Sequence, residues 1–304
     1  EYCFDTAVAA YLINPVEKGF AEEDLAERYG TVQMPAYAQL FGKMPEETAY
    51  ADKKEELEKY LCYCALVNVL VYQPLQKELK EIHSWKLFEE IEMPLVFTLH
   101  DMEKQGILVR REALKEYGDA LGERIHELER DIYDRAGEEF NINSPKQLGV
   151  ILFEKMHMPY GKKTKTGYST SAEVLEKLRF EDPVVEMVLE YRQLAKLKST
   201  YADGLDAFID EKDGRIHTTF NQTITATGRL SSTEPNLQNI PIRMELGRQI
   251  RRVFVPQEDC VFLDADYSQI ELRVLAHMSG DERLIEAYRE NADVHRATAS
   301  LVFH

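Results

Sequence analysis

The sequence predicts an α+β protein of more than one domain, because a helical pattern fills most of the chain and a strand-like pattern appears late in it. A length of 304 residues is enough for two or three domains, each with its own core. Between Arg111 and Arg135, apolar residues recur on one stripe of an amphipathic helix. From Arg215 to Asn221 the residues alternate and are rich in β-formers, which favours a strand.

The first part of the chain, residues 1–90, is expected to be rich in helix, with helical stretches at 22–28 and 53–71. The spacing of the four cysteines fits no zinc finger, so we expect packed core thiols in a reducing cytosol and no disulfides. These cysteines are Cys3, Cys62, Cys64 and Cys260.

Three further helix starts follow the long helix. Ser144 and Asp182 each stand before a proline, which is the pattern of an N-cap followed by proline at the first helical position. Thr170, with Glu173 three residues later, indicates a capping box. The last of these helices is expected to run from Pro183 to about Ile209.

After that helix, the spacing of apolar residues changes from a helical to an alternating, strand-like pattern. A turn is predicted at Asp213–Gly214. Further strands are expected at Ile250–Pro256 and Asp259–Asp266, after a polar stretch from Thr225 to Asn239.

The net charge of -17 usually argues against a nucleic-acid partner, but the location of charge matters more than its sum. Residues 141–200 carry more basic than acidic side chains, whereas the segments on both sides are acidic. The lysines of this segment lie in a Gly-bounded loop and late on a predicted helix, where phosphate contacts and ordinary solvated surface are both open interpretations. These lysines are Lys162, Lys163, Lys165, Lys196 and Lys198.

The longest apolar stretch, Leu61–Tyr72, is about half a membrane span, and no signal peptide is recognisable. We therefore expect a cytoplasmic protein without a membrane partner. The chain opens on Glu1, and residues 297–304 form an apolar run without a helix stop signal, so a piece of a longer protein is expected.

Carboxylates gather where an apolar run ends and a helix begins. Cys260–Leu263 is typical of a central strand, and Asp264 and Asp266 follow it. Phosphoryl transfer needs charge neutralised on the attacking and leaving oxygens, which two divalent metals held by carboxylates achieve. Asp266 is therefore a candidate metal ligand. Asp264 faces the same side of the strand and either joins the site or lies at its rim.

Arginines and amides are concentrated between Thr225 and Arg252. Arginine binds phosphate through two parallel hydrogen bonds, and amide side chains can read base edges. Taken alone, such a segment is as often ordinary surface as a binding site. Its members are Arg229, Arg243, Arg248, Arg251 and Arg252, together with Asn236, Gln238 and Asn239.

Three segments resemble the palm of the family A DNA polymerases, in particular their bacterial members. These segments are Thr225–Ser232, Asn236–Pro241 and Asp266–Arg273, in the order of the family. Lys196–Tyr201 is similar to the thumb of this family, and Phe4–Thr6 is similar to the late part of its 3'-5' exonuclease domain.

The resemblance implies three parts: an α-rich remnant of an exonuclease-like domain over residues 1–90, a helical thumb over 91–213 and a partial antiparallel-sheet palm over 214–304. It also implies the activity of a DNA-directed DNA polymerase, which extends a primer with deoxynucleoside triphosphates by two-metal phosphoryl transfer. The implied partners are primer-template DNA and the nucleotides. The full-length protein is expected to be a monomer.

Roles at the metal site follow from the same resemblance. Asp266 matches the first catalytic aspartate, a ligand of Mg2+, and Tyr267 offers its backbone carbonyl to the metal. Glu271 matches the side chain that helps to exclude a 2'-hydroxyl and so favours deoxynucleotides, and with Asp266 it forms the expected catalytic pair. Two Mg2+ ions are expected in a complete site.

Substrate contacts are implied in the same way. Arg229 matches the arginine that contacts the primer-terminal pair in the minor groove, with Asn236 and Gln238 near it on the duplex. Family thumbs grip the duplex backbone, which favours phosphate contacts for the five lysines named above. The other expected substrate-binding residues are Gln269, together with Arg243 and His295 near the incoming triphosphate.

Two departures from the family pattern have consequences. The fingers helix and the second catalytic aspartate are expected beyond His304, so these 304 residues alone are predicted not to polymerise. Cys64 occupies the position of an aspartate metal ligand of proofreading members, and thiols are poor magnesium ligands. We therefore expect the full-length enzyme to lack 3'-5' proofreading.

Two other functions stay open. The first is a non-catalytic scaffold that binds duplex DNA, and only an activity assay distinguishes such a scaffold from a polymerase. The second is RNA synthesis by a relative of the single-subunit RNA polymerases. Glu271 argues against that relative, because its motif resembles the version that selects deoxynucleotides.

Overall fold

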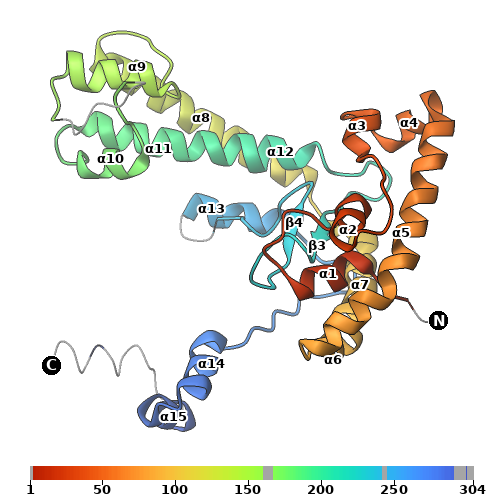
Figure 1. The fold of residues 1–304 in the computed structure, drawn as a ribbon. Coiled ribbons are helices and arrows are strands. Elements are labelled where there is room, and N and C mark those ends of the chain that lie inside the picture. Colours follow the sequence, from red (N-terminus) through yellow and green to blue (C-terminus); the bar gives the residue numbers. More distant parts are fainter. Residues whose placement is uncertain (1–2, 160–166, 242–244, 291–298, 300–304) are drawn as a thin grey trace. The chain divides into compact units, whose positions relative to one another are not determined.

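The computed structural model describes residues 3–159, 167–241, 245–290 and 299. It divides the chain into two compact units, residues 1–255 and 256–304. Helices make up most of the described structure, with small antiparallel sheets in the first unit (Figure 1). The predicted α+β class is confirmed. Both boundaries of the predicted three-part division fall inside the first unit. The three-part division stays a prediction.

The first unit begins with helices gathered around the long α5 (Lys54–Glu81). Its buried face shares one core with residues of α1 and α2, and it continues past the predicted end at residue 71 because buried leucines follow there, Leu75 and Leu79. The shorter helices are α1 (Thr6–Ile13), α2 (Glu22–Tyr29), α3 (Tyr37–Phe41) and α4 (Glu46–Asp52).

The prediction of packed core thiols is wrong for most of the cysteines. Cys3, Cys62 and Cys260 are exposed, Cys64 is half-buried and all four thiols are free. Helix residues two apart point to different sides, so Cys62 faces away from the buried Tyr60.

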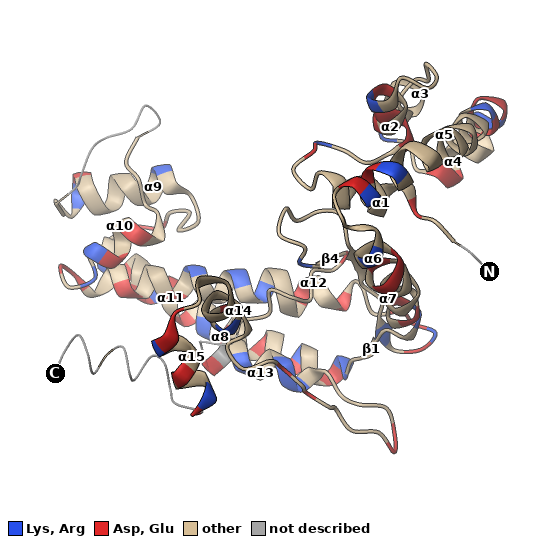
Figure 2. Cartoon of the chain, turned by 60° about the horizontal axis from the view of Figure 1, so that its bottom comes forward, with Lys and Arg blue, Asp and Glu red and all other residues tan. Residues whose placement is uncertain are grey.

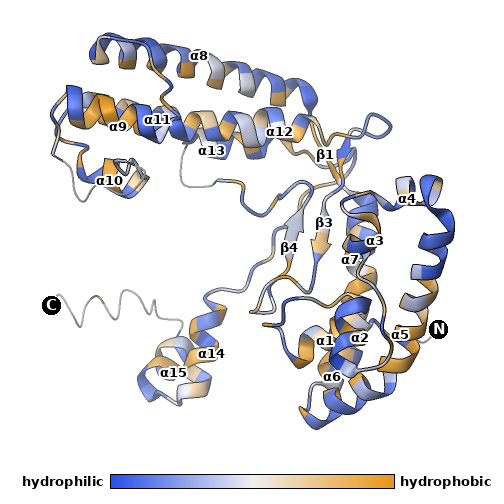
Figure 3. Cartoon of the chain, turned by 45° about the horizontal axis from the view of Figure 1, so that its top comes forward, coloured by the Kyte–Doolittle hydropathy of each residue, from blue (hydrophilic) through white to orange (hydrophobic). Residues whose placement is uncertain are grey.

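Two long helices, α8 (Arg111–Ala136) and α11 (Pro183–Leu197), lie side by side (Figures 1 and 3). The stripe predicted on the first helix is buried, at Leu114, Leu121, Ile125, Leu128 and Ile132. After α11 the chain continues through a π-helical turn, Lys198–Ala202, into α12 (Asp203–Asp206). This run ends close to the predicted end at Ile209.

The remaining described helices are shorter. In the first unit they are α6 (Trp85–Leu87), α7 (Met93–Gln105), α9 (Pro145–Gly149), α10 (Ala172–Lys177) and α13 (Glu245–Gln249), with π-helical segments at Phe88–Glu92 and Val150–Lys155. The second unit contains α14 (Ile270–Ser279) and α15 (Glu282–Arg289). Among the helices described, none has the length and apolar character needed to cross a membrane.

Two of the three predicted helix caps are present. Ser144 caps α9 and Asp182 caps α11, each by accepting a hydrogen bond from a backbone amide. The capping box at Thr170 is wrong, since α10 has no side-chain cap. Thr170 is buried, and its hydroxyl accepts a hydrogen bond from the Arg192 guanidinium at 3.3 Å. A tertiary contact therefore takes this side chain away from the helix end.

The predicted strand at 215–221 is divided between two sheets. Strand β2 (Arg215–Ile216) pairs antiparallel with β1 (Ile107–Leu108), and β3 (Thr219–Asn221) pairs antiparallel with β4 (Ser231–Thr233). The turn at Asp213–Gly214 is confirmed, and Gly214 takes the positive φ of 71° that glycine permits.

Two predicted strands are wrong. Residues 250–253 form a 3-10 helix, and residues 259–266 have no regular structure. In the latter segment Val261 and Leu263 are 86% and 91% exposed. A strand satisfies its backbone by pairing with another strand, and the described elements of this second unit are the helices α14 and α15.

Candidate DNA and nucleotide site

Asn236 and Gln238, two of the predicted duplex contacts, lie beside an anchor of buried hydroxyl groups. Ser232 and Thr218 are buried, and their hydroxyls hydrogen-bond to each other at 2.7 Å. The Ser232 hydroxyl also accepts a hydrogen bond from the amide of Leu237 at 3.1 Å. Asn236 and Gln238 flank Leu237 in the sequence and are exposed. The anchor therefore fixes the backbone between the two amides and leaves both side chains at the surface.

Arg229 is exposed and follows a tight turn at residues 225–228. The Thr225 hydroxyl donates a hydrogen bond to the Arg229 carbonyl at 2.6 Å. Gly228, at the end of the turn, has a φ of 81°, a conformation in which other residues are strained. Gly228 thus allows the backbone to turn directly before Arg229, the predicted primer contact.

In the second unit, Asp266 lies in an exposed irregular segment that leads into α14. Tyr267 beside it is 79% exposed, and Asp264 is exposed too. Glu271 lies in the first turn of α14 and is also exposed. The candidate catalytic carboxylates are therefore accessible to a metal ion or substrate.

Side chains of α14 and α15 contact the segment that follows Asp266, one at its backbone and one at the Gln269 side chain. Arg273 Nε donates to the Ser268 carbonyl at 2.9 Å, and the Tyr288 hydroxyl donates to Gln269 Oε1 at 3.2 Å. The Arg273 guanidinium lies 4.6 Å from the centre of the Tyr288 ring, a cation–π contact. Gln269 has a φ of 53°, which is uncommon outside glycine, so these contacts hold an unfavourable backbone conformation in place.

Of the predicted phosphate contacts, two are described. Basic and acidic residues are interspersed along α8 and α11 (Figure 2). Lys196 is exposed, whereas the Lys198 ammonium pairs with Asp203 at 2.8 Å. Lys198 must therefore exchange a carboxylate for a phosphate if it is to bind DNA. The predicted site residues outside the described residues are Lys162, Lys163, Lys165, Arg243 and His295.

The comparisons with known proteins decide the family. Residues 111–304 match the family described as DNA polymerase family A. The chain belongs to this family. DNA polymerase I of Bacillus subtilis (strain 168) is 49% identical over 302 residues, which are 99% of this chain and 34% of that protein. DNA polymerase I of Geobacillus stearothermophilus is 47% identical, with the same two coverages.

A solved structure agrees with this membership of DNA polymerase family A. The POL domain of Pol1 from M. smegmatis, in complex with DNA primer-template and dNTP, has a TM-score of 0.83 and 41% identity over 98% of this chain and 49% of that chain. The resemblance drawn from three motifs and the α+β multidomain class are thus confirmed. The chain spans about a third of the length of the curated relatives it matches.

Among the described residues of this family A chain, one group of three could hold a metal ion, and Asp266 is not part of it. Asp210, Asp213 and His217 place their ligand atoms within 4.8 Å of one another. His217 Nδ1 donates to the Glu103 carbonyl at 2.7 Å, and Nε2 lies 3.1 Å from an Asp213 carboxylate oxygen. The Glu103 carbonyl and then Asp213 raise the pKa of His217. A charge pair between His217 and Asp213 therefore explains, without a metal ion, why these side chains lie together.

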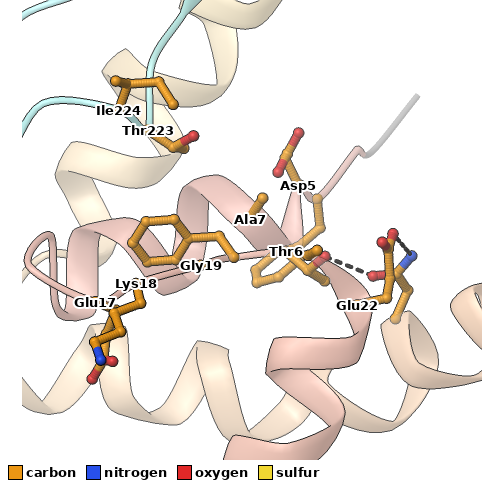
Figure 4. Close-up of a pocket in the computed structure, with 13 residues that line it drawn as sticks. Asp5, Thr6, Ala7, Glu17, Lys18, Gly19, Glu22, Thr223 and Ile224 are labelled. Atoms are coloured by element: carbon orange, nitrogen blue, oxygen red, sulfur yellow. Dashed lines mark hydrogen bonds between the residues drawn. The ribbon is translucent and has the colours of Figure 1, made fainter. Parts of the chain in front are cut away.

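A pocket of about 670 Å³ lies among the N-terminal helices and residues 223–224 (Figure 4). The Asp5 carboxylate caps α1 by accepting a hydrogen bond from the Val8 backbone amide at 2.9 Å, and the Glu22 carboxylate accepts one from the Asn68 side chain at 3.2 Å. Asn68 in turn accepts from the Thr6 hydroxyl at 2.6 Å. These side chains of the N-terminal helices are therefore engaged in contacts that hold the helices together.

Cys64 stands where proofreading members are expected to have a metal-binding aspartate. Burial raises the pKa of its thiol, which favours the neutral form, and the thiolate is the form that binds metals. This environment agrees with the predicted loss of proofreading. The loss stays a prediction, which incubation of the full-length protein with a mismatched primer and Mg2+ would check.

Proposed function

We propose that this chain forms part of a DNA-directed DNA polymerase that extends a primer with deoxynucleoside triphosphates. The observation that carries the proposal is the segment Asp266–Arg273, in which an exposed aspartate precedes a backbone carbonyl bonded by Arg273 and a Gln269 side chain bonded by Tyr288. Membership of DNA polymerase family A supports the activity. The complex described for the relative from M. smegmatis supports primer-template DNA and nucleotides as partners.

The reaction is attack of the primer 3'-hydroxyl on the α-phosphate of the nucleotide, with pyrophosphate as the leaving group. Two divalent metal ions, Mg2+ in this proposal, would neutralise charge on the attacking and leaving oxygens when bound. The Asp266 carboxylate and the Tyr267 carbonyl fit such an ion, because Mg2+ prefers oxygen ligands and few carboxylates. Glu271, in the first turn of α14, would exclude a nucleotide that carries a 2'-hydroxyl.

The first unit would hold the duplex. Arg229, Asn236 and Gln238 are exposed on backbone fixed by hydroxyl groups, which suits contacts to base edges. Lys196 would contact the phosphate backbone, and such contacts make binding weaker at high salt. The remaining predicted contacts keep their proposed roles, namely Lys162, Lys163, Lys165, Lys198, Arg243, Gln269 and His295.

Two neighbouring aspartates provide the test. In the full-length polymerase, Asp266→Asn is expected to lower primer extension with Mg2+ by at least about 100-fold, since a metal ligand is lost. Asp264→Asn is the matched control because Asp264 is an exposed acid two positions away, and it should retain activity within about threefold. Both variants should still bind primer-template. Full activity of Asp266→Asn would contradict the assignment, whereas equal loss in the two variants would show that Asp264 joins the site.

A further inference from the structure

Tyr11, in α1, reaches a turn 214 residues further along the chain. Its hydroxyl donates a hydrogen bond to the Thr225 carbonyl at 2.7 Å and accepts one from the Gly228 amide at 3.0 Å. Thr225 and Gly228 are the first and last residues of the turn that precedes Arg229. A single hydroxyl group therefore holds both ends of this turn.

The ring that carries this hydroxyl is itself fixed. Tyr11 is only 3% exposed and meets Phe20 edge-on, with ring centres 5.8 Å apart. A phenol donates through its one hydrogen and accepts through its lone pairs, so both bonds form at the same time. Loss of the hydroxyl would leave a backbone carbonyl and a backbone amide of the turn without these partners.

The approach to the turn is held from the same part of the chain. Gln222 Nε2 donates to the Glu92 carboxylate at 2.9 Å and to its backbone carbonyl at 3.2 Å. Residues 223–224 then form one side of the pocket among the N-terminal helices (Figure 4). The segment from Gln222 to Gly228 is thus contacted repeatedly by residues that lie before α7 in the sequence.

We infer that Tyr11 is a positioning residue for Arg229. The N-terminal helices serve polymerisation by fixing the turn that presents this arginine to the primer end, because small displacements of a positioning group are costly to catalysis. The inference rests on the proposed function for the role of Arg229. The hydrogen bonds that brace the turn are independent of that role.

Amide hydrogen exchange of the full-length protein tests the brace. In the wild type, the Gly228 amide should be protected although its turn is exposed. Tyr11→Phe keeps the ring and should speed exchange of this amide about tenfold. Tyr37→Phe is the matched control, because its hydroxyl donates to the Met44 carbonyl at 2.9 Å within the same group of helices. An unprotected Gly228 amide in the wild type, or one unaffected by Tyr11→Phe, would overturn the brace.

Primer extension tests the positioning role. Tyr11→Phe should lower kcat at a matched primer end about fivefold and reduce the preference for matched over mismatched ends, whereas Tyr37→Phe should change neither. In an Arg229→Ala background, Tyr11→Phe should have no further effect, because the two changes act through one contact. Additive effects would overturn the inference, since Tyr11 would then act by another route.

The two experiments separate the inference from the proposed function. If Arg229→Ala extends primers as fast as the wild type, the proposed role of Arg229 is wrong and the positioning role falls with it. Hydrogen exchange at Gly228 would still decide whether Tyr11 braces the turn. If Arg229→Ala is slow and Tyr11→Phe is as fast as the wild type, the proposed function stands and the inference is wrong.

Discussion

The hydroxyl of Tyr201 donates a hydrogen bond to the backbone carbonyl of Asn239. Tyr201 lies in the π-helical turn after α11 and is 7% exposed. Asn239 directly follows Gln238, one of the exposed amides proposed to contact the duplex. This bond joins the end of the helix that carries Lys196 to the segment that carries those amides. Two of the segments that resemble the family are therefore structurally coupled.

Tyr201→Phe is expected to weaken binding of primer-template by the full-length protein about fivefold, because the segment around Asn239 loses one anchor. The salt dependence of binding should not change, since no phosphate contact is removed. Fluorescence anisotropy with labelled duplex measures both. Tyr191→Phe is the matched control, because Tyr191 is equally buried on α11 and its hydroxyl donates to Glu129 at 3.0 Å. An equal effect of the two changes would contradict a specific role for Tyr201.

Tyr288 makes two contacts that substitution can separate. Tyr288→Phe removes the hydrogen bond to Gln269 and keeps the ring under Arg273, so kcat of nucleotide addition should fall about threefold. Tyr288→Leu removes both contacts and should cost about tenfold or more. Arg289→Ala, which changes only an exposed pair with Glu286, should leave the rate unaffected. Full activity of Tyr288→Leu would show that the backbone after Asp266 needs no such support.

Glu271→Ala is expected to admit ribonucleotides. Because the carboxylate is proposed to exclude a 2'-hydroxyl, its loss should lower the preference for deoxynucleotides by about tenfold or more in competition assays. Glu282→Ala provides the control, since Glu282 is an exposed acid in the first turn of the next helix. Unchanged discrimination in the Glu271 variant would remove this residue from sugar selection and reopen the comparison with RNA polymerases.

The pair of His217 and Asp213 predicts a pH-dependent contribution to stability. The Glu103 carbonyl and Asp213 raise the pKa of His217 in the folded state. The stabilisation is therefore complete below the unfolded pKa of about 6.5 and is lost as the pH rises through the folded pKa. The difference in melting temperature between the wild type and His217→Gln should shrink from about pH 6 to about pH 9. A difference that stays constant over this range would contradict the pairing.

The elements that could be predicted from the sequence are those with local signals. The apolar stripe of α8 and the caps at Ser144 and Asp182 depend on residues a few positions apart, and all three are present. At the two caps a short stretch of chain contains the residues that determine the local structure. The roles of Arg229 and Asp266 stay predictions, and the turn before Arg229 also depends on the distant Tyr11.

Contacts between distant residues could not be predicted in this way. Thr170 has the sequence of a cap, but its hydroxyl bonds to Arg192, 22 residues later. Nothing near Thr218 or Tyr11 in the sequence indicates that their hydroxyls hold segments of the candidate site. Lys198 and Asp203 pair at a separation of 5 residues, which is the spacing of a π-helical turn. Charge pairs on an ordinary α-helix are expected at separations of about three or four residues, so this pair is not anticipated.

The exposed run Cys260–Leu263 bears on how a protein of these 304 residues would behave at high concentration. An apolar run with β-forming residues and no strand partner among the described residues is a template for pairing with another copy, which starts aggregation. Acids flank this run at Asp259, Asp264 and Asp266. Like charges on two copies repel, so these carboxylates act as gatekeepers. In a protein of these 304 residues, neutralising these acids should therefore promote association.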